Sequence, residues 1–587
     1  MVGSLLLTAA ELCSMFVLLF GYTFFNSAAN GEFSGIAMVT ASFLMVLSLE
    51  IWFARWLTQE REVGPTIKLV LRSHTPWMLA WAYPWVLALN LPDPHNFYSR
   101  KLQILLGVIL VLHFFIYARV LLAGSHKKGR AVSKIFGLTA AVFFTGVTFW
   151  TGTACDLSGD EPHYLLMAQS LTRDGDLDLT NNYRNKDYRS FYHRGDLAPQ
   201  GLEHEVDGKR FSHHPLGPVL LVLPAFALFG RMGAALTMAL SAALALFLTL
   251  RALEETGAKG WALHATGVIG LFSSPLLLFS GVIYPEVPTA CLAASCLLLF
   301  LRKNWGWYGF SLGLMLWMHN RNVLLVLPFI FFAAWEIWKN QQPPRGREDS
   351  KKVIMDNASK LFIGFGITVL PLSFYFYHVY GLFTPLGAHH EPFSSLFRLS
   401  HFFTGFFGLV LDQECGLWFH FPVFALALLG GVLLYKSNNP LRYLVLGGFS
   451  FFYLFMSFYE NLGLTPAARY MVGVTPLLIL MLYPAVERIQ KHPGWMKLGG
   501  FLLLVGVLVN WILAAVPWMR YNKMEGENWI LKIAGGFLHL PLTSWEPAFN
   551  PAVIEFRSYA IAAFWMVLTV VLTVFFLKDK RAKGKNN

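Results

Sequence analysis

The chain has 587 residues, of which 55% are hydrophobic and 14% charged, and its formal net charge is +12. The charged fraction is about half that of an ordinary soluble domain, which excludes a water-soluble globular fold. The positive charge does not indicate a nucleic-acid partner, because the Lys and Arg residues lie in short segments between apolar runs, where they set membrane orientation.

Apolar runs of about 17 to 23 residues recur along the chain, and each is long enough to cross a bilayer as a helix. Examples are residues 4–25, 35–56, 102–123, 360–380 and 558–577. We therefore expect an all-α polytopic membrane protein with about sixteen transmembrane helices. Because Lys and Arg are enriched on the cytoplasmic side, basic segments such as 339–352 and the tail 578–585 place both termini in the cytoplasm of a multi-pass inner (plasma) membrane protein.

Residues 1–134 are expected to form an accessory membrane module of about four spans, ending in the basic stretch SHKKGRAVSK. A fifth span, residues 135–154, then leads outward into a loop, residues 155–214. This loop contains eleven Asp or Glu, seven Lys or Arg and five His residues, and no other segment is so polar. The chemistry of the protein is therefore expected there, facing the periplasm or exterior, within a catalytic core of residues 135–490.

The next apolar segment, residues 215–230, is expected to be re-entrant or interfacial rather than a full span. Counting it as a span would place later basic segments outside, and its three prolines remove backbone donors and break a regular helix. The C-terminal region, 491–587, is expected to contain two spans, an outer loop 517–557 and the basic tail. Spans after residue 230 are expected near 233–250, 262–280, 287–301, 305–319, 321–338, 360–380, 417–435, 443–458, 469–486, 498–516 and 558–577.

The sequence contains no GxxxxGK[ST] motif, no GxGxxG motif after a strand, no HExxH motif and no paired CxxC motif. Nucleotide-driven transport and zinc-protease chemistry therefore lose their usual support. The candidate residues have to be sought among the polar groups at the outer ends of the spans.

The motif SGDEPHY, from Ser158 to Tyr164, opens the polar loop. Ser158 and Glu161 fit a capping box, and an apolar stripe follows, which predicts a helix along the membrane surface. Asp160 and Glu161 then stand at the helix N-terminus, where a carboxylate backed by His163 suits proton abstraction from an acceptor hydroxyl. The structural alternatives are that Glu161 is only the cap and that Asp160 is a solvated acid favoured by the helix dipole.

Three more polar motifs lie at the outer ends of apolar spans: YPE ending at Glu286, HNRN around Arg321, and PAARY ending at Arg469 and Tyr470. The guanidinium group of an arginine offers a planar fork that matches phosphate oxygens. These residues are therefore candidates for binding the substrate or a lipid-linked phosphate. The alternatives are that Glu286 is a charge favoured at a helix N-terminus and that the arginines are snorkelling anchors.

A divalent metal is considered at one further place, the outer loop that carries His389-His390-Glu391 and Asp412-Gln413-Glu414-Cys415. Imidazole and carboxylate groups suit such an ion, whereas adjacent histidines do not easily converge on one metal. No other cofactor is indicated, and the sequence leaves metal binding open.

Taken together, five segments resemble a known family. They are GDEPHYL, DGDLDLTNNY, HHPLGPVLL, LDQECGLWFHFPVFALALLG and PAARYMVGVTPLL. They resemble the polytopic glycosyltransferases of the GT-C superfamily, in the bacterial branch akin to protein O-mannosyltransferases and aminoarabinose lipid A transferases. The resemblance covers about residues 130–490 and departs at the N-terminus, where extra spans come first.

The resemblance implies a GT-C-like helical fold whose large extracytoplasmic loop carries surface helices. It also implies a polyprenyl-phosphate-linked sugar donor and direct inverting transfer to an acceptor glycan, lipid or protein, beside membrane lipids. By matching position, Asp160 resembles the catalytic base with Glu161 as its neighbour, and Arg469 resembles a basic residue near the lipid phosphate.

A glycosyltransferase acting at the extracytoplasmic membrane face is therefore the expected function. The departing polyprenyl phosphate is anionic and needs positive charge, while the acceptor hydroxyl needs a base. The alternative is a transporter or flippase of a lipid-linked glycan, although most charges collect at span ends rather than at mid-bilayer. A catalytically inactive scaffold of the same fold is the third reading.

Overall fold

The structure is a computed structural model, and it describes residues 132–203, 208–339, 347–385, 398–459, 467–521, 526–550 and 553–578. The expected accessory module, 1–134, lies outside the described residues except for its last three positions. His389, His390 and Glu391, one half of the metal candidate, also lie outside them.

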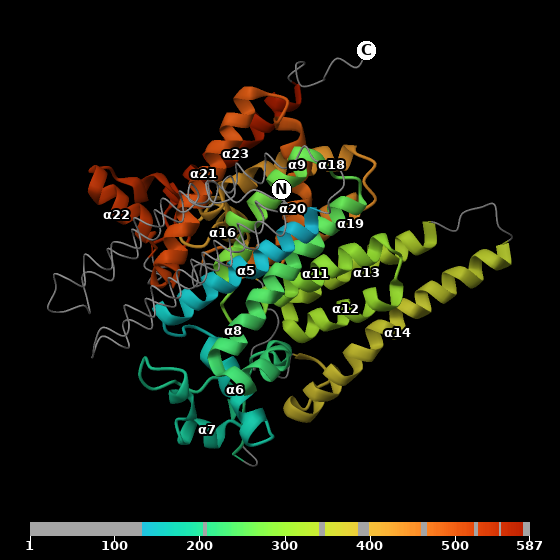
Figure 1. The fold of residues 1–587 in the computed structure, drawn as a ribbon, viewed down its shortest axis with the longest axis vertical. Coiled ribbons are helices and arrows are strands. Elements are labelled where there is room, and N and C mark those ends of the chain that lie inside the picture. The colour runs from blue at the N-terminus through green and yellow to red at the C-terminus, as the bar shows by residue number, and fades with distance from the viewer. Residues whose placement is uncertain are drawn as a thin grey trace, which may run out of the picture.

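The described chain is almost entirely helical (Figure 1). Its α-helices are α5 (Val132–Ala154), α6 (Glu161–Arg173), α7 (Thr180–Arg184), α8 (Leu216–Glu255), α9 (Gly260–Phe272), α10 (Pro275–Phe279), α11 (Glu286–Leu301), α12 (Trp305–Met318), α13 (Val323–Lys339), α14 (Arg347–Tyr380), α16 (Phe402–Leu411), α17 (Leu417–His420), α18 (Leu426–Lys436), α19 (Arg442–Met456), α20 (Thr475–Ile489), α21 (Pro493–Ala515), α22 (Trp529–Leu538) and α23 (Phe556–Lys578).

Short 3₁₀ segments and one small hairpin connect these helices. The 3₁₀ segments are η2 (Asp187–Ser190), η3 (Asn320–Asn322), η5 (Leu399–His401), η6 (Pro422–Ala425), η8 (Arg469–Met471), η9 (Pro517–Tyr521) and η10 (Leu542–Trp545). The hairpin pairs β1 (Leu202–Glu203) antiparallel with β2 (Arg210–Phe211), within the expected polar loop. This loop therefore folds into a compact helical and turn structure.

Seven helical segments among the described residues are long and apolar enough to cross a membrane. They are Val132–Gly152, Leu216–Glu255, Gly260–Phe279, Asn320–Lys339, Lys351–Tyr380, Pro493–Ala515 and Phe556–Lys578. The expectation of an all-α membrane protein is met. The count of sixteen spans is not, because sixteen less the four in the accessory module leaves about twelve for this part of the chain.

Two physical reasons account for the smaller number. Helices α11 and α19 contain 16 and 15 residues, and at about 1.5 Å per residue they are shorter than a hydrocarbon core of about 30 Å. Elsewhere an apolar window is not one helix: the window 469–486 starts with the turn η8 before α20 begins, and the window 417–435 is divided among α17, η6 and α18. A hydropathy window measures composition only, so it does not detect where one helix ends and another begins.

The proline-bearing segment at the start of α8 is helical, contrary to the expectation that its prolines break it. Pro218 lies in the first turn, where a missing N–H has no helical partner to lose, and Pro224 is accommodated inside the helix. The break comes instead at Gly230, which has φ 58°. Beyond it the chain bends so sharply that a Cβ atom on Gly233 would lie 2.0 Å from the Ala225 carbonyl oxygen. A glycine thus provides the bend.

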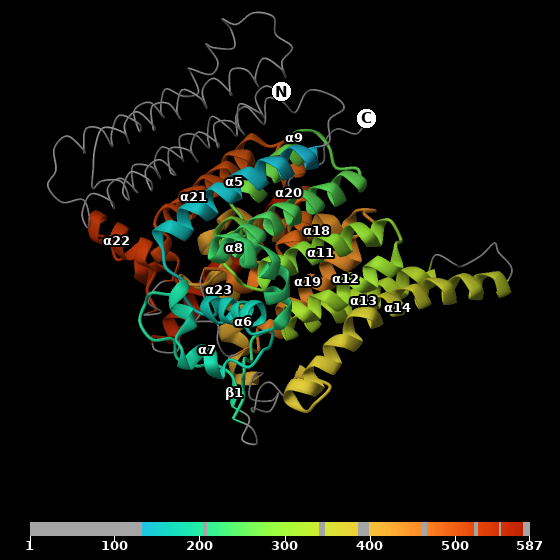
Figure 2. The same cartoon turned by 60° about the horizontal axis from the view of Figure 1, so that its bottom comes forward.

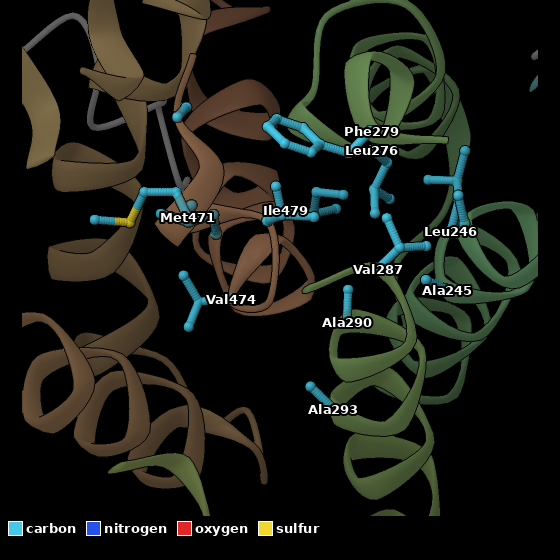
Figure 3. Packing of buried hydrophobic residues seen from close by; sticks show 14 of the residues in the cluster. Ala245, Leu246, Leu276, Phe279, Val287, Ala290, Ala293, Met471, Val474 and Ile479 are labelled. Atoms are coloured by element: carbon cyan, nitrogen blue, oxygen red, sulfur yellow. The ribbon is translucent and has the colours of Figure 1, made fainter. Parts of the chain in front are cut away.

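The long helices pack side by side, and the loop elements α6 and α7 gather at one end of them (Figures 1 and 2). Helices α5 and α11 pack along α8, and α12 packs along α14. Figure 3 shows part of the core between α8, α11 and the start of α20, where Val287 and Ala290 approach Val474 and Ile479. This packing holds in place the helix ends that carry Glu286 and Arg469.

Candidate functional site

Helix α6 begins at the acidic pair of the polar loop, as the sequence predicts. Gly159 takes a positive φ of 58°, Asp160 is the N-cap residue, and Glu161 is the first helical residue. A Cβ atom on Gly159 would lie 2.3 Å from the Tyr284 hydroxyl oxygen, so only glycine fits both this backbone conformation and this space. The residues from Glu161 to Ser170 are all buried, so the helix does not lie on the surface with one exposed face.

The two acidic residues point to different partners. Glu161 is 5% exposed, and its carboxylate accepts hydrogen bonds from the backbone N–H of Ser158 at 3.3 Å and of Ile283 at 3.0 Å. The capping box predicted with Ser158 as the N-cap does not form, because the N-cap of α6 is Asp160. Glu161 still accepts from two backbone amides, and the bond from Ile283 ties α6 to the chain before α11, so its contacts are structural.

Asp160 enters a network of ion pairs with three other predicted residues. Its Oδ2 atom lies 2.7 Å from Nη2 of Arg469, and Nε of Arg469 lies 2.9 Å from Oε1 of Glu286. The same Glu286 oxygen accepts a hydrogen bond from Nη2 of Arg321. The structure thus brings Asp160, Glu286, Arg321 and Arg469 into one cluster of two cations and two anions, in which Glu286 is buried and the other three are partly buried. We call it the four-charge cluster.

Aromatic rings cover both guanidinium groups. The Cζ atom of Arg469 lies 3.9 Å from the centre of the Tyr284 ring, and that of Arg321 lies 4.8 Å from the centre of the Tyr470 ring. Cation–π contacts of this kind strengthen when the ring and the cation are both removed from water. Tyr470, predicted as a site residue, thus joins the four-charge cluster through Arg321. Tyr284 was not among the predicted site residues, although it belongs to the YPE motif.

The backbone before Arg469 is strained. Ala468 has φ 52°, a conformation that residues with a Cβ atom rarely adopt. Its N–H donates to the Cys415 carbonyl at 3.0 Å, which holds this conformation in place. Strain of this kind persists only where the surrounding structure fixes it, and it clusters at functional sites.

Electrostatics keep Asp160 ionised. Burial by itself raises the pKa of this carboxyl, but the charge and the hydrogen bond of Arg469 outweigh burial and lower the pKa from its usual 3.8 to about 2. Asp160 is therefore a carboxylate at neutral pH, and a weak base as long as Arg469 is bound to it.

Glu286 has one oxygen available for a ligand. Its side chain is 4% exposed, and Oε2 has no hydrogen-bond partner among the described residues. Glu286, His319, Arg321 and Tyr470 are among the residues that line a cavity of about 10 Å³. A buried acceptor without a donor is costly, and a water molecule or a ligand hydroxyl beside it would satisfy it.

His163 lies next to the four-charge cluster as part of a hydrogen-bonded chain. Its Nδ1 atom is 2.9 Å from the Tyr183 hydroxyl, which accepts from the Gln200 backbone N–H at 3.4 Å. The Tyr183 hydroxyl thus links the His163 ring to the backbone at Gln200. His214, whose Nε2 lies 2.9 Å from the Gln200 side-chain oxygen, stacks on His163 with ring centres 5.2 Å apart.

Both of these histidines are neutral. Burial lowers the pKa of His163 to about 4 and that of His214 to about 3, against the opposing attraction of Asp160. His214 was not predicted as a site residue, and its only signal in the sequence is the HHP triplet before α8. The stacking that brings it to the site has no sequence signature.

The described residues contain no group of three or more His, Cys, Asp or Glu side chains arranged to hold a metal ion. In the described half of the metal candidate, Asp412 accepts hydrogen bonds from the backbone N–H of Glu414, Cys415 and Phe549 at 2.7 to 2.8 Å. Its oxygens are turned toward the backbone, so this residue is arranged as a structural tie.

Comparison with known proteins gives no match to the chain among family models, curated proteins or solved structures.

Proposed function

We propose that the protein is a membrane glycosyltransferase that moves a sugar from a polyprenyl-phosphate donor to an acceptor hydroxyl at the extracytoplasmic membrane face, with Asp160 as general base. The observation that carries the proposal is the ion pair between Asp160 and Arg469, with the second arginine held beside it by Glu286. One cluster thus contains a carboxylate that can accept a proton and guanidinium groups that can bind phosphate.

In the proposed reaction the acceptor oxygen attacks the anomeric carbon from the side opposite the phosphate. The new carbon–oxygen bond forms as the bond to the phosphate oxygen breaks, and the phosphate leaves with the bonding electron pair. The acceptor proton passes to Asp160. Arg469 and Arg321, which are both mostly buried, offset the charge on the leaving phosphate.

The arrangement also supplies a way to couple donor binding to base strength. Arg469 is shared between Asp160 and Glu286, and an incoming phosphate competes for the same guanidinium. As Arg469 turns toward the phosphate, the pKa of Asp160 rises and its carboxylate becomes a better base. Activation of the base would then depend on the presence of the donor.

The test is mass spectrometry of surface glycoconjugates in cells that lack this protein and are complemented with variants. Asp160→Asn should abolish the sugar addition that the unmodified chain restores, while its level in the membrane stays unchanged. The matched control is Asp196→Asn, in the same loop but with a side chain that is 65% exposed, and it should restore the addition. An active Asp160→Asn variant would reject the assigned base.

Movement of a fluorescent lipid-linked sugar across liposomes that contain only this protein would favour the flippase instead. In that case sugar transfer should be absent in the same liposomes when donor and acceptor are both supplied. The measurement separates the two functions because a transferase changes the mass of the acceptor and a flippase does not.

A further inference from the structure

A second polar cavity lies beside the N-terminus of α6 and shares no residue with the four-charge cluster. Its volume is about 30 Å³, and it is formed by the end of α5, the loop after it, the bend of α8, the chain before α11 and the segment η9. The lining residues that matter here are Cys155, Asp156, Glu161, Arg231 and Arg520. We call this space the arginine cavity.

Arg520 is a buried cation with no acidic partner in the part of the chain that the structure describes. It is 6% exposed, and no carboxylate oxygen of the described residues lies within 4 Å of it. Its Nη1 atom donates to the Leu278 carbonyl at 2.5 Å, whereas Nε is buried with no hydrogen-bond partner among the described residues. A buried charge of this kind is strongly unfavourable unless an anion and hydrogen-bond acceptors compensate it.

Two further arginines lie around the arginine cavity. Arg231 donates to the Cys155 carbonyl at 2.7 Å and lies 3.7 Å from a carboxylate oxygen of Asp156. Arg194, which is not a lining residue, reaches the Cys155 sulfur at 3.7 Å. The positive side of the arginine cavity is therefore built by Arg231 of α8 and Arg520 of η9.

The two carboxylates at the arginine cavity also accept hydrogen bonds from backbone amides. The oxygens of Asp156 accept from the backbone N–H of Leu157 at 3.0 Å and of His193 at 3.1 Å. Those of Glu161 accept from Ser158 and Ile283, as described above. Two arginines and two carboxylates line the arginine cavity, and Arg520 forms no ion pair with an acid among the residues that the structure describes.

We propose that the arginine cavity binds a phosphate-type oxyanion, with Arg520 and Arg231 as its main ligands. Guanidinium forks match phosphate oxygens in geometry and charge, and the buried Nε of Arg520 supplies a donor that needs an acceptor. The volume suits a small polar group and is too small for a sugar. A lipid phosphate headgroup and free inorganic phosphate share this chemistry.

The arginine cavity adjoins the four-charge cluster along two chain segments. Glu161 and Ile283 line the cavity, while the neighbouring residues Asp160 and Tyr284 contact Arg469. The inference does not require the proposed transfer reaction, since it rests on the contacts of Arg520 and Arg231.

The test uses Cys155, a half-buried thiol in the wall of the arginine cavity. The purified full-length chain in detergent is treated with a thiol-alkylating reagent, and peptide mass spectrometry follows the rate at each cysteine. Potassium phosphate should slow alkylation of Cys155 several-fold relative to potassium chloride at the same ionic strength. Alkylation of Cys291 and Cys296, which lie in α11 away from this cavity, should not change.

Variants identify the ligands of the anion. Arg520→Gln should remove the protection by phosphate, and Arg231→Gln should weaken it. Arg231 is about a quarter exposed, so its variant remains informative if loss of the buried Arg520 prevents folding. The matched control is Arg302→Gln, a half-exposed arginine that pairs with Glu255 elsewhere in the protein, and it should keep the full protection.

A lipid arm distinguishes the two sources of phosphate. The same measurement is made in bicelles of phosphatidylcholine with or without a single-phosphate polyprenyl lipid. Protection by the lipid alone assigns a headgroup site, and protection by both ligands assigns a site open to any phosphate group. Absence of protection by either ligand, or full protection that persists in both Arg520→Gln and Arg231→Gln, overturns the proposal.

Discussion

Two clusters of acidic residues, which the sequence predicts to lie on the same side of the membrane, are built in opposite ways. In the four-charge cluster, Asp160 and Glu286 are paired with the side chains of Arg469 and Arg321. In the segment Asp412–Glu414, the acids accept hydrogen bonds mainly from backbone amides, including those of Phe549 and Gly526. The side chain of an arginine can rotate toward a ligand. A backbone amide cannot do so unless the surrounding fold also rearranges.

The Asp412–Glu414 segment therefore connects separate loops through hydrogen bonds. Gln413 exchanges hydrogen bonds with Asn528 and with the chain before α23, so the loop after α16 is fixed to the segment that carries α22. Two residues further on, the Cys415 carbonyl accepts from the N–H of Ala468, directly before Arg469. The Asp412–Glu414 segment thus supports the backbone that positions Arg469.

The largest effect is expected when Arg469, the cation that Asp160 and Glu286 share, is removed. Arg469→Gln should lower the free energy of unfolding by about 3 to 5 kcal/mol, because Asp160 and Glu286 are left mostly buried without their common partner. Thermal denaturation in detergent measures the loss, and glycoconjugate mass spectrometry should show no transfer. Arg302→Gln, at a half-exposed pair, should cost at most about 1 kcal/mol. Equal costs for the two variants would contradict the view of the cluster as a mostly buried network.

Acidification tests the comparison further, because the stacked pair His163 and His214 lies beside the four-charge cluster. Their pKa values of about 4 and about 3 in the folded state lie below the unfolded value of 6.5. The unfolded chain therefore binds more protons between these values, and stability falls as pH is lowered from about 6.5 toward 4. The loss should be on the order of 2 kcal/mol per histidine by pH 5. His214→Gln should flatten the dependence of the melting temperature on pH, and an unchanged slope would count against a buried neutral His214.

The variant Asp412→Asn tests whether the role of the Asp412–Glu414 segment is structural. The amide group of asparagine would turn a donor toward a backbone N–H, so the free energy of unfolding should fall by about 1 to 3 kcal/mol. Sugar transfer per folded molecule should stay close to that of the unmodified chain. Loss of transfer at normal stability would show that Asp412 takes part in the chemistry and would remove the distinction between the clusters.

Gly159→Ala should have the smallest effect on stability, and it probes the packing beneath Arg469. The new Cβ atom meets the Tyr284 hydroxyl and holds a positive φ, which costs about 1 to 2 kcal/mol. Because Tyr284 lies against Arg469, transfer should fall more than stability does. Gly175→Ala is the matched control, with φ 76° and open space around it. It should show the conformational cost alone, with transfer unchanged.

The sequence by itself determined that this is a helical membrane protein, and it supplied most of the polar residues that form the four-charge cluster. Apolar runs require a membrane environment, and the polar motifs at helix ends supplied Asp160, Glu286, Arg321, Arg469 and Tyr470, which the structure gathers at one place. These features follow from composition and from local position along the chain. Neither requires knowledge of which helices touch.

Only the tertiary structure decided how those residues are used. Asp160 and Arg469 are 309 positions apart, and their pairing depends on how α6, α11 and η8 pack. The same packing turns Glu161 toward Ile283, stacks His214 on His163 and buries Arg520 with no acidic partner among the described residues. The structure also divides apolar stretches, which hydropathy treats as single spans, into separate helices and turns. Contacts between distant segments have no local signature, because the packing energy that creates them is shared among many residues.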